Sequence, residues 1–441
     1  MKYDRFFELA KAAGIEEAEL SVSTSYSLSF SLFHGEIDSY TTSNSSSFLA
    51  RGIYKGKMGS IVSDVYNNDL AKYFVEQIVA NASVIENDDP VFIFKGSEKY
   101  RKINTFNRQL ASIPIEKKIE IAKQIESDLR NGDPRIIEVQ TVEYAESSTS
   151  STMLNSHGLK LTQKNNYFLY YAGAVAKENE QVKTGGDFYF GNDFSKFVPS
   201  DLVQKAIKET VAQLGGYPCE SATYKAVLSP DVVASLMSAY VSSAIAEDVQ
   251  KNSSLFVGKL HQKVASKKVT IEDLPLSKTL FASSFDGEGV ATYNKPIIKN
   301  GVLETYLYNL TTAAKDGVSS TGNGVVGGGS KVDTAPSYLK MKPGRKTQEQ
   351  LFEDIKNGVY ITEVSGLHAG LNPRSGNFSL QSSGFLVENG KISHPLDIIT
   401  VSGNLVDLFN SIIEVGNDSK QFISACECPS VVVKKLAVSG K

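Results

Sequence analysis

Residues 20–32 read LSVSTSYSLSFSL and decide the fold class. Every odd position from Ser21 to Ser31 is serine, whereas the even positions, apart from Thr24, are apolar. A period of two residues predicts a β-strand with one buried and one solvated face. A helix is expected over residues 3–13, and His34-Gly35-Glu36 is typical of a turn. The opening of the chain therefore predicts a helix followed by an antiparallel meander.

The same order of elements recurs further along the chain. Working outward from the first strand, we predict strands at 47–53 and 59–63, a helix at 69–81, a second long helix at 115–130, two strands within 136–153, a strand from 167 to 176, and a helix at 199–214. Tyr217-Pro218 then interrupts the pattern. We expect an N-terminal α+β domain over residues 1–218.

Short strands and glycine turns dominate residues 219–441, which we predict to be a β-rich second domain. Its long helix should begin at Pro230, after the capping residue Ser229, and run to about residue 249. The other expected elements are strands at 285–292, 302–310, 358–364, 378–388, 397–401 and 430–438, and a helix at 405–413. The overall prediction is an α+β protein of two domains.

Composition excludes several classes of function. The 46 Lys and Arg residues against 49 Asp and Glu residues give a net charge of −3, so no basic field attracts nucleic acid. No stretch approaches the roughly 20 apolar residues that span a bilayer. The charged N-terminal segment does not resemble a signal peptide, and three cysteines are too few for a disulfide framework. We expect a cytoplasmic protein without direct nucleic-acid or membrane contact.

Common catalytic motifs are missing from the sequence. The glycine run at 321–331 lacks the Gly-Lys-Ser/Thr of a phosphate-binding loop, which predicts a flexible loop instead. Cys426 and Cys428 form a C-x-C pair, whereas structural zinc needs four ligands, so ordinary buried thiols are favoured. The five histidines include no HExxH or HExxxH pair, and there is no G-x-S-x-G elbow.

Two loops could still contribute to a cleft. Asp286 and Glu288 place two carboxylates in one turn, where they could perform acid/base work, bind a cation or simply be solvated. The loop at 365–376 combines glycines with His368, Asn372 and Arg374. Such a loop is a good place for a binding cleft, although a structural turn explains it equally well.

Several blocks of the C-terminal half, taken in order, resemble the TldD/PmbA family. They are FDGEGVAT (285–292), NGVLETYLYN (300–309), STGNG (320–324), SGLHAGLNP (365–373), SGNFSL (375–380), GF (384–385), ENGK (388–391) and VGND (415–418). The match runs from about residue 224 to 440. The blocks SGLHAGLNP and SGNFSL resemble the PmbA branch, also called TldE.

The resemblance implies a two-domain α+β protein. In this family TldD is a zinc metalloprotease whose helix carries HExxxH, with a later cysteine as a further ligand. TldD pairs with PmbA in a dimer that encloses a cavity, and the pair matures peptide-antibiotic precursors and degrades peptides. The family has also been labelled a modulator of DNA gyrase.

This sequence departs from the TldD pattern at the zinc ligands. Counting back from SSLF (253–256) places HExxxH on residues 237–242, where Met237, Ser238 and Ser242 stand in for the two histidines and the glutamate. Counting back from Pro429 places the cysteine ligand on Val415. We therefore expect neither a catalytic residue nor a zinc ion in this chain, and expect zinc in a TldD-type partner.

The leading interpretation is a PmbA-type subunit that lacks its own zinc site. It would pair with a TldD-type chain, or with itself as a homodimer, and hold an unfolded peptide by strand-edge pairing. Candidate cleft residues are Asp286, Glu288, Asn309, His368, Asn372 and Arg374. One alternative is a hydrolase that is active alone through a metal held by Asp286, Glu288 and His368. Another is a non-enzymatic regulator that binds DNA gyrase.

Overall fold

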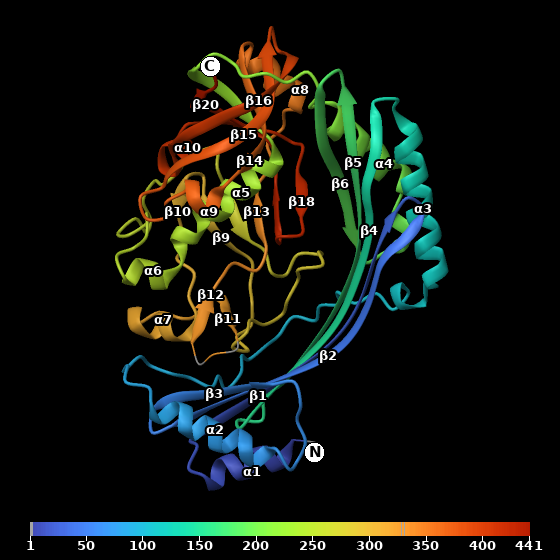
Figure 1. Cartoon of the computed structure of the whole chain (residues 1–441). Helices are drawn as coiled ribbons and strands as arrows, with labels where there is room; N and C mark the ends of the chain where they lie inside the picture. The colour runs from blue at the N-terminus through green and yellow to red at the C-terminus, as the bar shows by residue number, and fades with distance from the viewer. Residues whose placement is uncertain (1–2, 328, 330) are drawn as a thin grey trace.

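One antiparallel sheet of six strands forms the N-terminal half of the molecule, in the order β3-β2-β1-β4-β5-β6 (Figure 1). The computed structural model describes residues 3–327, 329 and 331–441. The strands are β1 (Glu17–Phe33), β2 (Glu36–Tyr54), β3 (Lys57–Ser63), β4 (Ile136–Asn155), β5 (Lys160–Glu178) and β6 (Gln181–Gly191). The helices of this half are α1 (Asp4–Ala12), α2 (Ala71–Ser83), α3 (Ile115–Gly132) and α4 (Pro199–Val211), with 3₁₀ turns at Leu110–Ser112 and Phe194–Lys196.

Each end of the long sheet has its own hydrophobic core. At one end α1 and α2 cover the sheet, so that Phe6 and Phe74 pack with Leu20. At the other end α3 and α4 cover it around Phe30 and Leu32. The predicted apolar positions of β1 thus serve two separate cores. Between the cores the sheet is polar, and serine hydroxyls such as those of Ser25 and Ser45 bond across the strands at 2.7 Å.

The strand predictions in this half were incomplete: the strand expected from 167 to 176 begins at Lys160, and β6 was not predicted. Residues 136–153 form part of a single strand, β4, rather than two strands. β2 begins at Glu36, the last residue of the predicted turn, and continues through residues 37–46, for which no strand was expected. Residues 37–46 of β2 and the middle of β4, at 147–152, carry polar residues on both faces, so the alternation that marks a strand is lost there.

The C-terminal half contains a sheet that closes on itself. Its order is β16-β15-β14-β7-β20-β17, and β16 also pairs with β20, which completes a small barrel. The strands are β7 (Ala222–Leu228), β14 (Gly358–Ser365), β15 (Asn377–Glu388), β16 (Lys391–Asn404), β17 (Ile412–Val415) and β20 (Val431–Ser439). The α+β class predicted from the sequence is confirmed, and the strands at 358–364, 378–388 and 430–438 are present.

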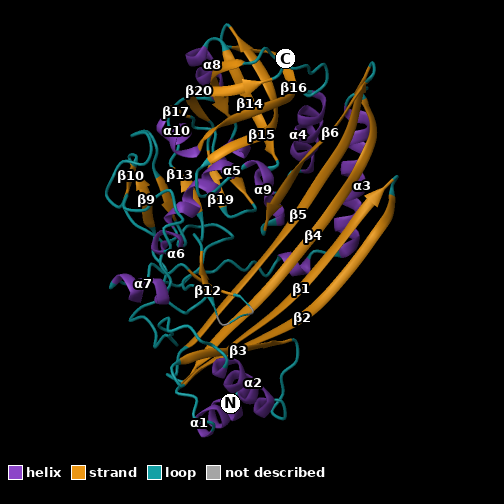
Figure 2. Cartoon of the chain, turned by 60° about the vertical axis from the view of Figure 1, so that its left-hand side comes forward, coloured by secondary structure: helices purple, strands orange, loops and turns teal. Residues whose placement is uncertain are grey.

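Smaller elements surround the barrel (Figure 2). A second sheet has the order β10-β9-β8-β13-β19-β18, and β11 pairs with β12. The strands of these two sheets are β8 (Ile271–Asp273), β9 (Lys295–Lys299), β10 (Val302–Leu303), β11 (Gly324–Val326), β12 (Val332–Thr334), β13 (Leu339–Met341), β18 (Lys420–Phe422) and β19 (Cys426–Cys428). The helices are α5 (Pro230–Val241), α6 (Ala246–Gln250), α7 (Leu310–Asp316), α8 (Gln348–Ile355), α9 (Leu367–Gly370) and α10 (Leu405–Asn410), with a 3₁₀ turn at Ser242–Ala244.

Several predictions in this half need correction: the helix expected over 405–413, for example, ends at Asn410, and β17 begins at Ile412. The helix expected over 230–249 breaks at Ile245, which is extended and pairs with Leu307, so α5 and α6 are separate. Residues 285–292 form a turn rather than a strand, because the Asp286 side chain accepts N–H groups from residues 288 and 290. Of residues 302–310, Val302–Leu303 alone form a strand, and α7 begins at Leu310.

The two halves contact each other along the sheet. The Asn165 amide of β5 donates to the Leu280 carbonyl at 2.8 Å, and the Tyr100 hydroxyl donates to the Gly289 carbonyl at 2.7 Å. Lys183 of β6 forms an ion pair with Asp397 of β16. We propose that residues 1–218 and 219–441 are the two domains, because the first long sheet lies within the first range and the other sheets lie within the second.

Candidate functional site

The α5 helix occupies the segment where the family resemblance places the zinc ligands. Ser229 caps α5 by accepting the Val232 N–H, and Pro230 occupies the first turn. Met237 is fully buried, and Tyr240 stacks on Phe409 with ring centroids 4.2 Å apart. The face of α5 that carries Met237 and Tyr240 therefore packs into the hydrophobic core.

The other predicted ligand positions carry no side chain suited to zinc. Ser238 is exposed. The Ser242 hydroxyl donates to the Ala239 carbonyl at 2.7 Å, and Val415 is a buried residue of β17. Thioether, hydroxyl and isopropyl groups at these positions do not fit a zinc ion, which binds imidazole, thiolate and carboxylate ligands.

The cysteines do not supply the missing ligands. Cys426 and Cys428 are both buried in β19, and burial raises the pKa of each thiol. Within the described residues, no three His, Cys, Asp or Glu side chains lie close enough together to hold a metal ion. The trio Asp286, Glu288 and His368 considered from the sequence is therefore not a metal-binding group.

The Asp286 and Glu288 carboxylates hold the glycine-rich segment in place. Asp286 accepts N–H groups from Glu288 and Val290 at 2.9 Å and from Gly324 at 2.8 Å. A Cβ atom on Gly324 would lie 2.5 Å from Glu288 Oε2, so only glycine fits at this position. The turn is thus a structural connection to the segment at 321–331, of which Gly328 and Ser330 lie outside the described residues.

Asn309 lies beside this turn. It caps α7 in a capping box with Thr312: the Asn309 side chain accepts the Thr312 N–H at 2.7 Å, and the Thr312 hydroxyl accepts the Asn309 N–H at 3.1 Å. The next residue, Leu310, donates its N–H to Glu288 Oε2 at 2.8 Å. The structure thus brings Asp286, Glu288 and Asn309 together in one buried hydrogen-bonded cluster.

Burial shifts both carboxylates toward neutrality. It raises the pKa of Asp286 to about 6, against the three donated N–H groups, which lower it. Burial, followed by repulsion from Asp286, raises the pKa of Glu288 to about 7, while the N–H donated by Leu310 and then Arg51 of β2 oppose this shift. Their raised pKa values would suit these two carboxyl groups to acid/base chemistry. They lie, however, between the two halves of the molecule rather than in an open cleft.

Sequence reasoning missed the buried ion pair behind Glu288. Arg51 and Glu19 face each other across β2 and β1, and each is 1% exposed. Arg51 Nη2 donates to Glu19 Oε1 at 2.8 Å, and Nε donates to the same oxygen at 3.1 Å. A charged residue within the apolar run FLARGIY was the available signal, but the partner could be found only with the register of the sheet.

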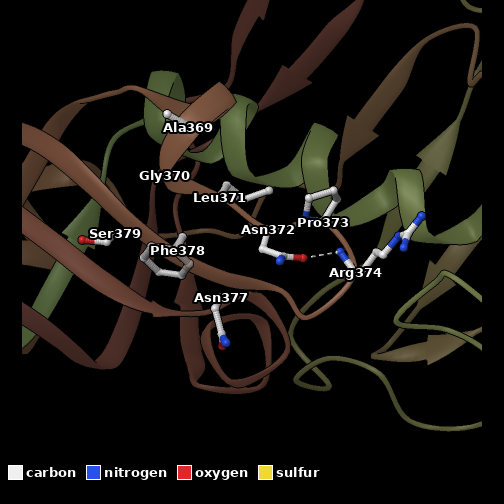
Figure 3. A pocket seen from close by; sticks show the side chains of 9 residues that line it. All are labelled: Ala369, Gly370, Leu371, Asn372, Pro373, Arg374, Asn377, Phe378 and Ser379. Atoms are coloured by element: carbon white, nitrogen blue, oxygen red, sulfur yellow. Dashed lines mark hydrogen bonds between the residues drawn. The ribbon is translucent and has the colours of Figure 1, made fainter.

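His368, Asn372 and Arg374 lie on a second, exposed surface. The loop after α9 and the start of β15 line an open hollow of about 570 Å³ (Figure 3). Its lining residues are Ala369, Gly370, Leu371, Asn372, Pro373, Arg374, Asn377, Phe378 and Ser379. The Asn372 side chain accepts the Arg374 and Ser375 N–H groups at 3.0 and 3.1 Å and so fixes the loop.

This hollow has an apolar floor and a cationic rim. Phe378 is buried at its base, whereas Arg374 extends to the side (Figure 3). The Arg374 guanidinium makes no hydrogen bond or ion pair within the described part of the chain. His368 is exposed on α9, just outside the lining. The hollow can therefore accept a ligand that combines apolar and anionic groups.

The fold and these sites define an α+β protein in which a long antiparallel sheet accompanies a small barrel. Residues 18–82, 108–214 and 221–440 match, respectively, domain 1, the central domain and the C-terminal domain of the PmbA/TldA metallopeptidases. The chain belongs to the PmbA/TldD metallopeptidase family. The resemblance found in the sequence is thereby confirmed.

Known proteins match over nearly the whole chain. A crystal structure from Thermotoga maritima, described as a putative modulator of a DNA gyrase, is 33% identical, with a TM-score of 0.91 over 99% of both chains. The Haemophilus influenzae protein named metalloprotease PmbA homolog is 26% identical over 98% of this chain and 94% of its own. TldE from Thermococcus kodakarensis, 22% identical, shares the fold with a TM-score of 0.89 over both full chains.

The described helices are too short or too polar to cross a membrane.

Proposed function

We propose that this chain is a PmbA/TldE-type subunit of a TldD/PmbA peptidase complex, acting on unfolded peptides or peptide-antibiotic precursors. It has no zinc site of its own and depends on a TldD-type chain with HExxxH for hydrolysis. Family membership supports the peptidase setting. The claim to be tested is that hydrolysis requires a second, TldD-type chain.

The single observation that carries this proposal is the packing of α5. Met237, at the first histidine position, has no exposed surface and belongs to the core that includes Tyr240 and Phe409. A metal-bound water needs an open coordination position, and a glutamate at position 238 would serve as its base. Here the helix instead stabilises the domain, and Ser238 cannot act as a base.

The hollow beside Phe378 is our candidate for the contact with peptide. Arg374 supplies a free cation, and the floor of the hollow is apolar. Peptides from many sequences could bind weakly here while the partner chain carries out the chemistry. Because Arg374 is exposed and its side chain makes no hydrogen bond or ion pair within the described residues, we expect its replacement to leave the fold unchanged.

The test is reconstitution. The chain should be purified alone, analysed for zinc, and assayed on an unstructured peptide with and without a TldD-type chain from the same genome. We expect less than about 0.1 zinc per chain, no cleavage alone, and chelator-sensitive cleavage by the mixture. Chelator-sensitive cleavage by the isolated chain would overturn the proposal.

A further inference from the structure

Six ionisable side chains form a row across the junction between the two halves. Four are carboxyl groups and two are cations, contributed by β1, β2, β8, β9 and the turn at residues 286–291, called the junction turn below: Glu19, Arg51, Asp273, Lys295, Asp286 and Glu288. Each member of the row interacts electrostatically with the next. Five of them are at most 4% exposed, and Asp286 is half-buried. The junction therefore encloses two more acids than cations.

Each cation of the row is already paired with one carboxylate. Arg51 donates to Glu19 through Nε and Nη2. Lys295 Nζ lies 3.1 Å from Asp273 Oδ2. If the other two carboxyl groups were also ionised, four negative and two positive charges would leave a net charge of −2 in the interior. Burying unpaired charge is costly, whereas one proton on each of these two groups makes the row neutral.

The two carboxyl groups without a cation are those of Asp286 and Glu288 in the junction turn. Within the described residues neither forms an ion pair, and both accept backbone N–H groups instead. Burial raises the pKa of both groups, and repulsion from Asp286 and then from Glu19 raises that of Glu288 further. The accepted N–H groups oppose these shifts, as do Lys295 at Asp286 and Arg51 at Glu288.

The N-terminal half also contacts the junction turn with uncharged groups. The Tyr100 hydroxyl donates to the Gly289 carbonyl at 2.7 Å, and the Ser97 hydroxyl accepts the Ala291 N–H at 3.0 Å. The side chains beside Gly289 come from the β4–β5 hairpin and are apolar: Met153, Leu159 and Leu161. These contacts attach the junction turn to the N-terminal half whether or not its carboxyl groups are ionised.

On its other side the junction turn holds two segments of the C-terminal half. Glu288 Oε2 accepts the N–H of Leu310, where α7 begins, and Asp286 Oδ2 accepts the N–H of Gly324, where β11 begins, both at 2.8 Å. In Figure 1, α7 and β11 lie on the side of the C-terminal half that faces the N-terminal sheet. The two carboxyl groups thus connect α7 and β11 to the N-terminal half through a single turn.

We propose that the junction turn is a proton-controlled latch: with two protons it fastens α7 and β11 to the N-terminal half, and without them it releases both segments. Opening exposes the ionised carboxylates to water. It also hydrates Glu19 Oε2 and Arg51 Nη1, which are buried without a hydrogen-bond partner in the described part of the chain. The latch is a property of the junction and does not depend on the peptidase role.

The direction of the pH effect follows from the proton that the closed latch holds. The pKa of Glu288 is about 7 when the latch is closed, against an ordinary 4.5. Opening therefore releases a proton between these values, so the opening equilibrium rises with pH to about pH 7 and then levels off. From Glu288 alone the rise between pH 5 and pH 8 is on the order of 10- to 100-fold. Asp286, with a pKa of about 6, adds to it.

Hydrogen–deuterium exchange of the full chain between about pH 5 and pH 8 tests the latch. After correction for the chemical exchange rate, protection of the Leu310 and Gly324 amides should fall on the order of 10- to 100-fold as pH rises. The barrel strand β20 reports global unfolding, and its protection at pH 8 should be at least about tenfold higher. The proposal is overturned by an absent fall, or by equal protection at β20, since the turn would then open only with the whole chain.

Glu288→Gln is the matched test, because the amide oxygen can still accept the Leu310 N–H but the side chain cannot ionise. It should remove most of the pH dependence at Leu310 and Gly324. Glu353→Gln makes the same change at an exposed position of α8 and should leave the pH dependence unaltered. A folded Glu288→Gln variant that keeps the full fall would contradict the latch. If this variant does not fold, the measurements on the unaltered chain still decide.

Discussion

Replacing Arg51 with methionine should strongly destabilise the N-terminal half. The side chain is 1% exposed, and its partner Glu19, equally buried, would lose both donated hydrogen bonds. Burial already raises the pKa of Glu19, with Arg51 as the main opposing influence. Without Arg51 the carboxyl group must take up a proton or remain charged in an apolar environment. Either outcome lowers the free energy of unfolding.

The expected size follows from the burial of the pair. Removing one partner of a buried ion pair costs about 3–5 kcal/mol. For a unit of 150–250 residues, each kcal/mol lowers Tm by about 2–4 °C. Arg51→Met should therefore lower Tm by about 6–20 °C. The double variant Glu19→Leu with Arg51→Met leaves no unpaired charge and should unfold within about 1 kcal/mol of the unaltered chain.

Differential scanning calorimetry of the single and double variants decides the question. The control is Lys72→Met, which breaks an exposed pair with Glu76 on α2 and should cost less than about 1 kcal/mol. A loss below about 1 kcal/mol for Arg51→Met would refute the reasoning. So would a double variant as unstable as the single one, since the cost would then come from lost packing.

Three further predictions concern the candidate site. Because the pKa of Glu288 is raised from 4.5 to about 7, the native state holds a proton that the unfolded state releases, so the free energy of unfolding falls as pH rises through this window. Glu288→Gln should remove about 3 kcal/mol of that fall, measured by urea unfolding at about pH 5 and pH 8; an unchanged slope would contradict the assigned pKa. Asn309→Ala, which removes the α7 cap, should cost about 0.5–2 kcal/mol in the same assay, and no loss would mean that the capping box is dispensable. Arg374→Ala should leave Tm unchanged but raise the KM for an acidic peptide cleaved by the reconstituted pair; an unchanged KM would remove the hollow from the peptide path.

The sequence predicted the strand over 20–32 because apolar and polar residues alternate where a strand packs against helices. It predicted fewer strand residues where no helix covers the sheet. Residues 37–46 of β2 and the middle of β4 are polar on both faces, so period-two reasoning had no signal there. The most exposed stretch of β2 is thus the stretch that a search for buried faces overlooks.

The candidate site, too, was predicted from the sequence only in part. The loop at 365–376 was singled out for its glycines and its polar residues, and it does line a hollow. Asp286 and Glu288 were expected to lie in one turn, and they do, but the sequence could not show that their oxygens would accept the backbone N–H groups of residues 288, 290, 310 and 324. The Arg51–Glu19 pair required the register of β1 against β2, which local sequence does not contain.

The central claim is that α5 packs the core in place of a zinc site, and restoring the ligand types tests it most directly. The triple variant Met237→His, Ser238→Glu and Ser242→His should be purified free of any TldD-type chain, dialysed with zinc, and measured for bound metal and for cleavage of an unstructured peptide. We predict little bound zinc and little cleavage, because Val415 leaves the last ligand missing and Met237 belongs to the core. About one tightly bound zinc per chain in this variant, with chelator-sensitive cleavage of the peptide, would contradict the account.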